Sequence, residues 1–162
     1  MTEPRQCRDD LNELLRAEYA CAGRLAALLA DEAAALNGRD IDAVEALVDR
    51  KQTLMQEFEA LESRRLALLE HAGFGGPQPD IEGCIAWCDG SGRLARGWRA
   101  LLERIRDCQH RNRCNGAILE SSRRHAQQAL ALLRGQSPQP GLYTPHGEST
   151  AAGSLGRSLA KA

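Results

Sequence analysis

Aromatic and β-branched residues are scarce in this sequence. Two each of phenylalanine, tryptophan and tyrosine occur among 162 residues, and the hydrophobic 43% of the chain is mostly leucine and alanine. Strands favour aromatic and β-branched side chains, whereas leucine, alanine, glutamate, arginine and glutamine lose little rotamer freedom in a helix. The composition therefore disfavours a sheet and predicts an all-α protein of single-domain size.

An excess of charge of one sign is also lacking. The net charge is −1, from 21 basic and 22 acidic residues that are interspersed along the chain. No broad field exists to attract nucleic acid or anionic lipid. The arginines at 104, 106, 111 and 113 have few aromatic residues among them, so they suit a solvated helix face better than a site for stacked bases. The sequence predicts no nucleic-acid partner.

Long apolar runs are missing as well. No stretch approaches the roughly 18 apolar residues that span a bilayer, and the first residues, MTEPRQCRDDLNELL, contain no signal-peptide h-region. We therefore expect a cytoplasmic protein without membrane insertion. In that compartment the six cysteines are expected to be reduced thiols without disulfides.

Patterns typical of catalysis are not found. The glycine-rich segment GFGGP is not followed by Lys-Ser or Lys-Thr, so it lacks the charge that a phosphate loop needs. No pair of carboxylates stands out, and the four histidines are scattered along the chain. The sequence predicts that the protein is not an enzyme and needs no cofactor.

Several cysteines and one histidine are candidate metal ligands. Cys84 and Cys88 are one helical turn apart, and Cys108, His110 and Cys114 follow later, so a mixed zinc site is conceivable. The spacing is not the CxxC pairing of common structural zinc sites, and Cys108 falls on an apolar helix face. The sequence therefore predicts no metal site.

Heptad patterns, in contrast, are present along most of the chain. Apolar residues recur at alternating intervals of three and four, which predicts helices at about 4–36, 41–71 and 93–134. A short helix at 81–88 is expected in the connector, after Asp80. Between the first two helices, Gly38 is expected to adopt the left-handed conformation that closes a helix, and Asp40 to cap the next one.

These helices predict an elongated three-helix bundle or coiled coil over residues 1–135: an antiparallel hairpin, the short connector helix and one long C-terminal helix. The last helix is expected to run back alongside the second. At 1.5 Å per residue it is the longest of the helices, so its end, around 125–134, should project past the hairpin turn. Residues 136–162 are rich in glycine, serine and proline, which predicts a flexible tail. Whether a short helix forms near the end of this tail is left open.

Polar residues interrupt the heptad seams. Four of them are charged: Glu18, Glu32, Lys51 and Arg65. Either their aliphatic stems lie along a half-covered seam and their charged ends reach solvent, or they fix the register of the helices, as polar seam residues do in coiled coils. Asn112 and Asn115, followed by Gly116, lie in the middle of the longest seam. Either a buried amide network holds this helix, or a bend or contact point is needed there.

The order of these features resembles the FlgN family of flagellar export chaperones. The first half of the family pattern is matched by Leu28, Leu29, Glu32, Ala35, Leu36, Asp40, Leu47, Lys51 and Leu54. The second half, N..NG and then YxxxG, is matched by Asn112, Asn115, Gly116, Tyr143 and Gly147. The cysteine-rich CIAWCDG is a departure from the pattern.

The resemblance implies a chaperone for the hook-filament junction proteins FlgK and FlgL, which keeps them unassembled and delivers them to the export gate. In the family, the tail tyrosine, here Tyr143, is implicated in docking on the gate protein FlhA. Because the last helix is the longest, we expect apolar surface without a partner, and hence the client site, on its projecting end and the tail, at Leu119, Ala126, Leu130, Leu133 and Leu142. A homodimer is left open, and the competing hypothesis is a structural coiled-coil module that oligomerises and has no client.

Overall fold

The computed structural model describes residues 3–135, and all of the regular structure in this range is helical. The helices are α1 (Pro4–Asn37), α2 (Ile41–His71), α3 (Ile81–Cys88) and α4 (Arg93–Leu133). This confirms the all-α fold, and each helix begins and ends within one residue of its predicted bounds. Within residues 3–135, none of the helices combines the length and the apolarity that a membrane crossing requires.

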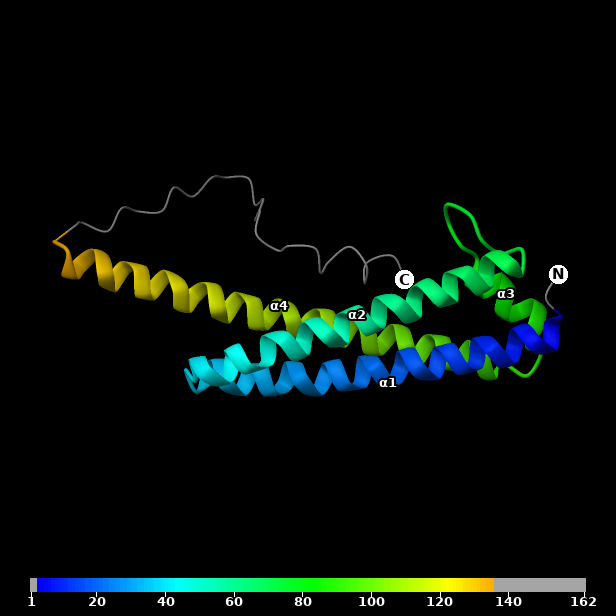
Figure 1. Cartoon of the computed structure of the whole chain (residues 1–162), viewed down its shortest axis with the longest axis horizontal. Helices are drawn as coiled ribbons and strands as arrows, with labels where there is room; N and C mark the ends of the chain where they lie inside the picture. The colour runs from blue at the N-terminus through cyan, green and yellow to red at the C-terminus, as the bar shows by residue number, and fades with distance from the viewer. Residues whose placement is uncertain (1–2, 136–162) are drawn as a thin grey trace.

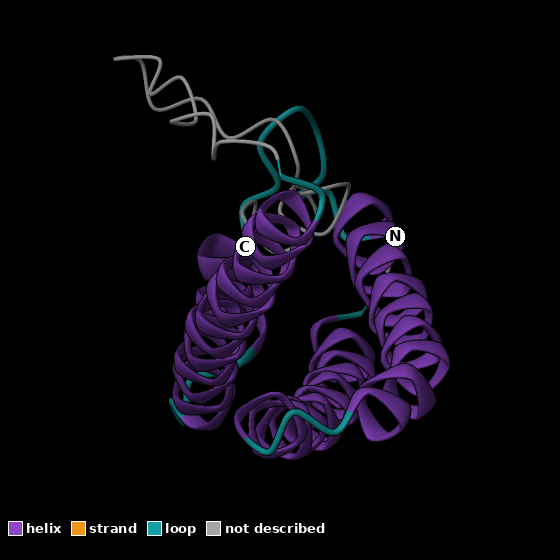
Figure 2. Ribbon diagram, turned by 90° about the vertical axis from the view of Figure 1, so that its left-hand side faces the viewer, coloured by secondary structure: helices purple, strands orange, loops and turns teal. Residues whose placement is uncertain are grey.

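The three long helices form an elongated bundle (Figure 1). α1 and α2 make an antiparallel hairpin, α3 lies at the end of the bundle next to the start of α1, and α4 runs in the same direction as α1. The expectation that α4 lies alongside α2 is wrong, because α4 packs mainly along α1. The short α3 contacts both α1 and α4, and it displaces the chain sideways before α4 begins. Viewed along the bundle, the helices surround a common interior (Figure 2).

The turn between α1 and α2 has an unexpected residue at its left-handed position. Arg39 has φ +54°, whereas Gly38, the residue expected there, is right-handed with φ −76°. The Asp40 amide donates to the Ala35 carbonyl at 2.9 Å, and Arg39 donates to Leu36 at 3.2 Å. These two bonds are the pair that defines a Schellman motif with Arg39 at its left-handed position.

The start of α2 and the start of α4 are both capped by aspartates. The Asp40 carboxylate accepts from the Ala43 amide at 3.0 Å, as predicted. Asp89 lies before α4 and accepts from the amides of Leu94 at 2.7 Å and Ser91 at 2.9 Å. The side-chain hydrogen bond from Ser91 and the amide of Leu94 lower the pKa of Asp89 to about 2. Asp89 thus joins α3 to α4 through a fixed, ionised cap.

The apolar core is concentrated at the end of the bundle where α3 lies. The larger cluster joins Leu11 of α1, Leu69 of α2, Ile85 of α3 and Leu101 of α4, which are all buried. Toward the hairpin turn a smaller cluster consists of Leu25, Leu29 and Cys108. The apolar core therefore thins toward the turn, where polar contacts join the helices instead.

Candidate functional site

A constant register between α1 and α4 determines what the end of α4 can contact. Hydrogen bonds join Tyr19 to Arg104, Ala22 to Cys108 and Leu29 to Asn115, and their partners are 85 or 86 residues apart. An equal offset along two helices means that they run in parallel. The same offset brings the end of α1, at residue 37, level with residue 122 of α4. About 11 further residues of α4, a length of about 16 Å, therefore extend beyond α1. Figure 1 shows α4 projecting past the end of α1.

A buried polar layer joins the three long helices just before this point. The Asn115 side chain donates to the Glu32 carboxylate at 2.8 Å and to the Leu29 carbonyl at 2.9 Å. Lys51 of α2 donates to the same carboxylate at 3.0 and 3.1 Å. Asn112, one turn earlier, is half-buried. The contacts of Asn115 are those of the amide network that the sequence left as one alternative.

The other two charged seam residues are paired at the middle of the bundle. Arg65 donates from Nε to both oxygens of Glu18 at 3.0 and 3.1 Å, and the two side chains are 6% and 0% exposed. The guanidinium lies 5.0 Å from the centre of the Trp98 ring. Burial raises the pKa of Glu18, although Arg65 opposes this shift. Since all four seam charges have partners on another helix, the contacts favour the register interpretation over half-covered stems.

The hairpin turn and α4 enclose a hollow of about 320 Å³. It is lined on the turn side by Ala35, Leu36, Arg39, Asp40, Ile41 and Val44, and on the α4 side by Leu119, Ser122, His125 and Ala126. Ile41 is 63% exposed and Leu119 is 52% exposed. Large apolar side chains that remain in solvent at the edge of a concave surface are typical of a binding site.

The apolar face of α4 continues past this hollow without a covering helix. We define the α4 stripe as Leu119, Ala126, Leu130 and Leu133, whose spacings of seven, four and three residues place them on one helix face. Leu130 is 50% exposed and Leu133 is 85% exposed. These are the predicted client-binding residues that the structure describes. Leu142 and Tyr143 lie outside the described residues.

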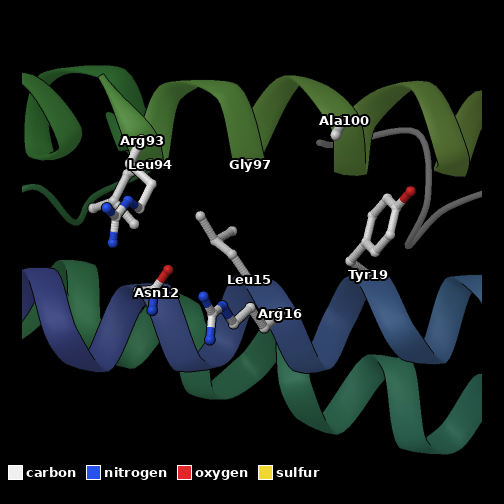
Figure 3. Close-up of a pocket in the computed structure, with 8 residues that line it drawn as sticks. All are labelled: Asn12, Leu15, Arg16, Tyr19, Arg93, Leu94, Gly97 and Ala100. Carbon is white, nitrogen blue, oxygen red and sulfur yellow. The ribbon is translucent and has the colours of Figure 1, made fainter. Parts of the chain in front are cut away.

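A second hollow, of about 250 Å³, lies between α1 and α4 near the start of α4 (Figure 3). Gly97 and Ala100 line it on α4, and their small side chains leave room between the helices. Leu15 and Leu94 also line it, but both are buried, so this hollow offers little apolar surface that lacks a partner. This hollow was not predicted from the sequence, although glycine and alanine three residues apart on a helix are a sign of such space.

The cysteines and histidine considered as one mixed metal site do not come together. Cys108 belongs to the small cluster with Leu25 and Leu29, and exposed Cys114 lies 3.7 Å from His110 on the same helix. Cys84 and Cys88 instead face Cys7, which the sequence analysis did not consider. Cys7 is 77 residues from Cys84 in the chain, and no local pattern connects them.

The fold and the α4 stripe define the class of this molecule: an elongated α-helical bundle with an exposed apolar helix face. A family model described as FlgN protein matches residues 7–151. The chain therefore belongs to the FlgN family, a family of flagellar chaperones, which confirms the resemblance seen in the sequence. The match spans all four helices and also includes Leu142 and Tyr143.

Two curated relatives are similar over most of their length. Both are described as flagella synthesis protein FlgN, one from Yersinia enterocolitica and one from its serotype O:8 / biotype 1B. Each is 25% identical to this chain over 116 residues, which cover 72% of this chain and 71% of the relative. No solved structure matches the chain.

Proposed function

We propose that this protein is a cytoplasmic, substrate-specific chaperone that binds FlgK and FlgL, prevents their premature assembly and delivers them to the flagellar export gate. Membership of the FlgN family supports the general role. The observation that supports a client site is the α4 stripe, an apolar helix face that continues past the end of α1 and stays exposed. Terminal segments that become helical on assembly would fit such a face by helix-in-groove binding.

The exposed area of the α4 stripe indicates how strongly it can hold a client. Complete burial of a leucine side chain contributes about 1.5–3 kcal/mol, so covering three leucines that are half exposed or more contributes roughly 3–6 kcal/mol before the costs of association. This alone supports only weak binding. The hollow at the hairpin turn, with Ile41 at its edge, and the residues after 135 would add contacts. A complex of this kind can be released at the export gate.

The charged side chains around the α4 stripe are paired with one another. Glu120 accepts from Arg123 at 2.9 and 3.1 Å, and Arg124 lies 3.7 Å from the same carboxylate. Two arginines share one glutamate here, so positive charge predominates beside the α4 stripe, and we propose that the apolar face provides most of the contact while acidic residues flanking the client segment are favoured.

Tyr143 is proposed as the residue that docks on the export gate protein FlhA. The family match includes this position, and the surrounding residues are mostly small or polar, so an aromatic side chain there suits a protein contact. The variant Tyr143→Ala should bind FlgK normally but lose binding of the loaded chaperone to FlhA. Unchanged FlhA binding would show that the docking residue lies elsewhere.

The proposed function is tested by size-exclusion chromatography with light scattering on the protein mixed with FlgK, and separately with FlgL, from the same organism. A stable complex with either supports the chaperone. Repeating the measurement after deletion of residues 135–162 shows whether that segment contributes to the client site.

The competing function is an oligomerisation module whose apolar stripe is covered by a second copy of the chain. It predicts a tight dimer alone and no complex with FlgK or FlgL. That result would replace the chaperone proposal.

A further inference from the structure

Three cysteine thiols meet where α1 and α3 pack together. Cys7 lies in the second turn of α1, and Cys84 and Cys88 lie one turn apart on the same face of α3. Their Sγ atoms all lie within 4.8 Å of one another, and those of Cys7 and Cys84 are 3.6 Å apart. We call these three residues the thiol triad. Among residues 3–135, no other group of three or more cysteine, histidine or acidic side chains converges in this way.

The other two buried cysteines show a different arrangement. Cys21 donates to the Leu54 carbonyl and Cys108 to the Ala22 carbonyl, both at 3.4 Å. Each of these thiols thus has a backbone acceptor and behaves as a small core side chain. In the thiol triad, Cys88 also has a backbone acceptor, the Ile85 carbonyl at 3.9 Å, but the sulfurs of Cys7 and Cys84 have each other as hydrogen-bonding partners.

The spacing of the thiol triad matches that of thiolates around a metal ion. Sulfur ligands lie about 2.3 Å from Zn²⁺, so three of them in trigonal or tetrahedral geometry are about 3.8–4.0 Å apart. The sulfurs of Cys7 and Cys84 are 3.6 Å apart and all three lie within 4.8 Å of one another, so shifts of less than about 1 Å would bring all three to such an ion. From this geometry we propose that the thiol triad binds one thiophilic d¹⁰ metal ion, Zn²⁺ or Cu⁺, and that the ion links α1 to α3.

An opening to solvent leads to the thiol triad. Cys88 lines a hollow of about 430 Å³ together with Arg8, Asp9, Asp89 and Arg93. The two aspartates balance the two arginines, so a site of three thiolates keeps its own net charge, which a cation reduces. Coordination from the protein stops at three sulfurs, and the position toward the hollow is free for water when the ion prefers four ligands.

Metal binding at the thiol triad is coupled to the loss of protons, because thiolates rather than thiols coordinate the ion. A metal ion displaces the proton itself on coordination. Binding therefore releases protons and weakens as the pH falls.

The test uses the full-length protein, reduced and stripped of metal, and titrates it with Zn²⁺ or, without oxygen, with Cu⁺ in competition with a chromogenic chelator. We expect one equivalent of at least one of these ions to bind per chain and to raise the Tm by roughly 5–10 °C. X-ray absorption should show three sulfur neighbours at about 2.2–2.3 Å. The two titrations distinguish zinc from copper.

Cys84→Ser and Cys7→Ser should each weaken binding at least about a hundredfold, whereas Cys114→Ser, at an exposed cysteine outside the thiol triad, should leave binding unchanged. Circular dichroism checks that each variant is folded. The absorption spectrum of the unmodified protein provides a result that does not depend on any variant. Fewer than three sulfur neighbours, unchanged binding in Cys7→Ser and Cys84→Ser, binding that is lost in Cys114→Ser, or no binding of either ion would overturn the proposal.

Discussion

The side-chain amide of Asn115 lies 2.8 Å from the carboxylate of Glu32, and this contact marks the last polar layer before α4 leaves the hairpin. Glu32 also accepts two hydrogen bonds from Lys51, so one buried carboxylate joins α1, α2 and α4. The layer holds the register that determines how far α4 projects. The exposed α4 stripe is therefore a consequence of the buried contacts that precede it.

Removing this amide should destabilise the bundle. Asn115→Ala removes the donor to the Leu29 carbonyl and to one Glu32 oxygen. We therefore expect the free energy of unfolding to fall by about 1–3 kcal/mol. Urea denaturation measures it. The matched control is Asn112→Ala, one turn earlier and half-buried, which should change stability by less than about 0.5 kcal/mol. Equal losses in both variants would contradict the role assigned to Asn115.

Breaking the buried ion pair of Glu18 and Arg65 should lower the free energy of unfolding strongly, whereas replacing both residues with apolar ones should lower it little. Glu18→Ala removes the carboxylate that accepts from Arg65 Nε and leaves only Glu62, at 3.8 Å, as a counter-charge, and we expect a loss of about 3 kcal/mol in unfolding free energy. The double variant Glu18→Leu with Arg65→Met should recover most of this loss. As a control, Glu57→Ala removes an exposed pair with Arg24 between the same two helices, and it should cost less than about 1 kcal/mol. A double variant as unstable as Glu18→Ala would argue against an electrostatic cause.

The Asp89 cap predicts a defined loss of stability in acid. Its pKa falls from 3.8 to about 2 on folding, so the unfolded chain binds the proton more readily and stability decreases as the pH falls. The contribution of Asp89 should be complete above about pH 5 and disappear between about pH 4 and pH 2. Urea denaturation of the protein and of Asp89→Asn across this range should show a stability difference that shrinks with acidification. A difference that stays constant with pH would exclude this linkage.

Two of the helix ends that have a left-handed residue, those of α1 and α2, predict opposite effects of substitution. Arg39 has φ +54° and Gly73 has φ +88°, and both occupy the same position of a Schellman motif. Arg39→Gly should stabilise the protein by up to about 1 kcal/mol, because glycine adopts this conformation without a steric penalty. Gly73→Ala should destabilise it by about 1 kcal/mol. Thermal unfolding of both variants measures this, and a loss of stability in Arg39→Gly would contradict the account of the turn.

Much of the fold could be predicted from the sequence because its signals are local. Heptad spacing, the aspartates before α2 and α3, and the glycines after α2 determine the helix bounds within one residue. The projection of α4 past the turn follows from helix lengths alone. The polar residues of the seam could also be identified, since charge on an apolar face requires a partner.

Other features depend on contacts that no local pattern encodes. A heptad seam predicts which face of α4 is buried but not whether α1 or α2 covers it, and the short α3 decided this by displacing the chain. Glycine was the better candidate for the left-handed position, yet the turn adopts a register in which Arg39 occupies it. Cys7 meets Cys84 across 77 residues, so their proximity could be seen only in three dimensions.

The measurement that tests the central claim most directly is the affinity of the full-length protein for FlgK, by isothermal titration calorimetry, with and without the paired substitutions Leu130→Glu and Leu133→Glu. The control is Leu66→Glu, at a leucine of α2 that is also exposed but lies far from the α4 stripe. If the client covers the α4 stripe, the paired variant should bind FlgK at least about tenfold more weakly, and the control should bind with an unchanged Kd. Equal affinities in all three proteins, with the helical bundle intact, would contradict the claim that the projecting end of α4 binds the client.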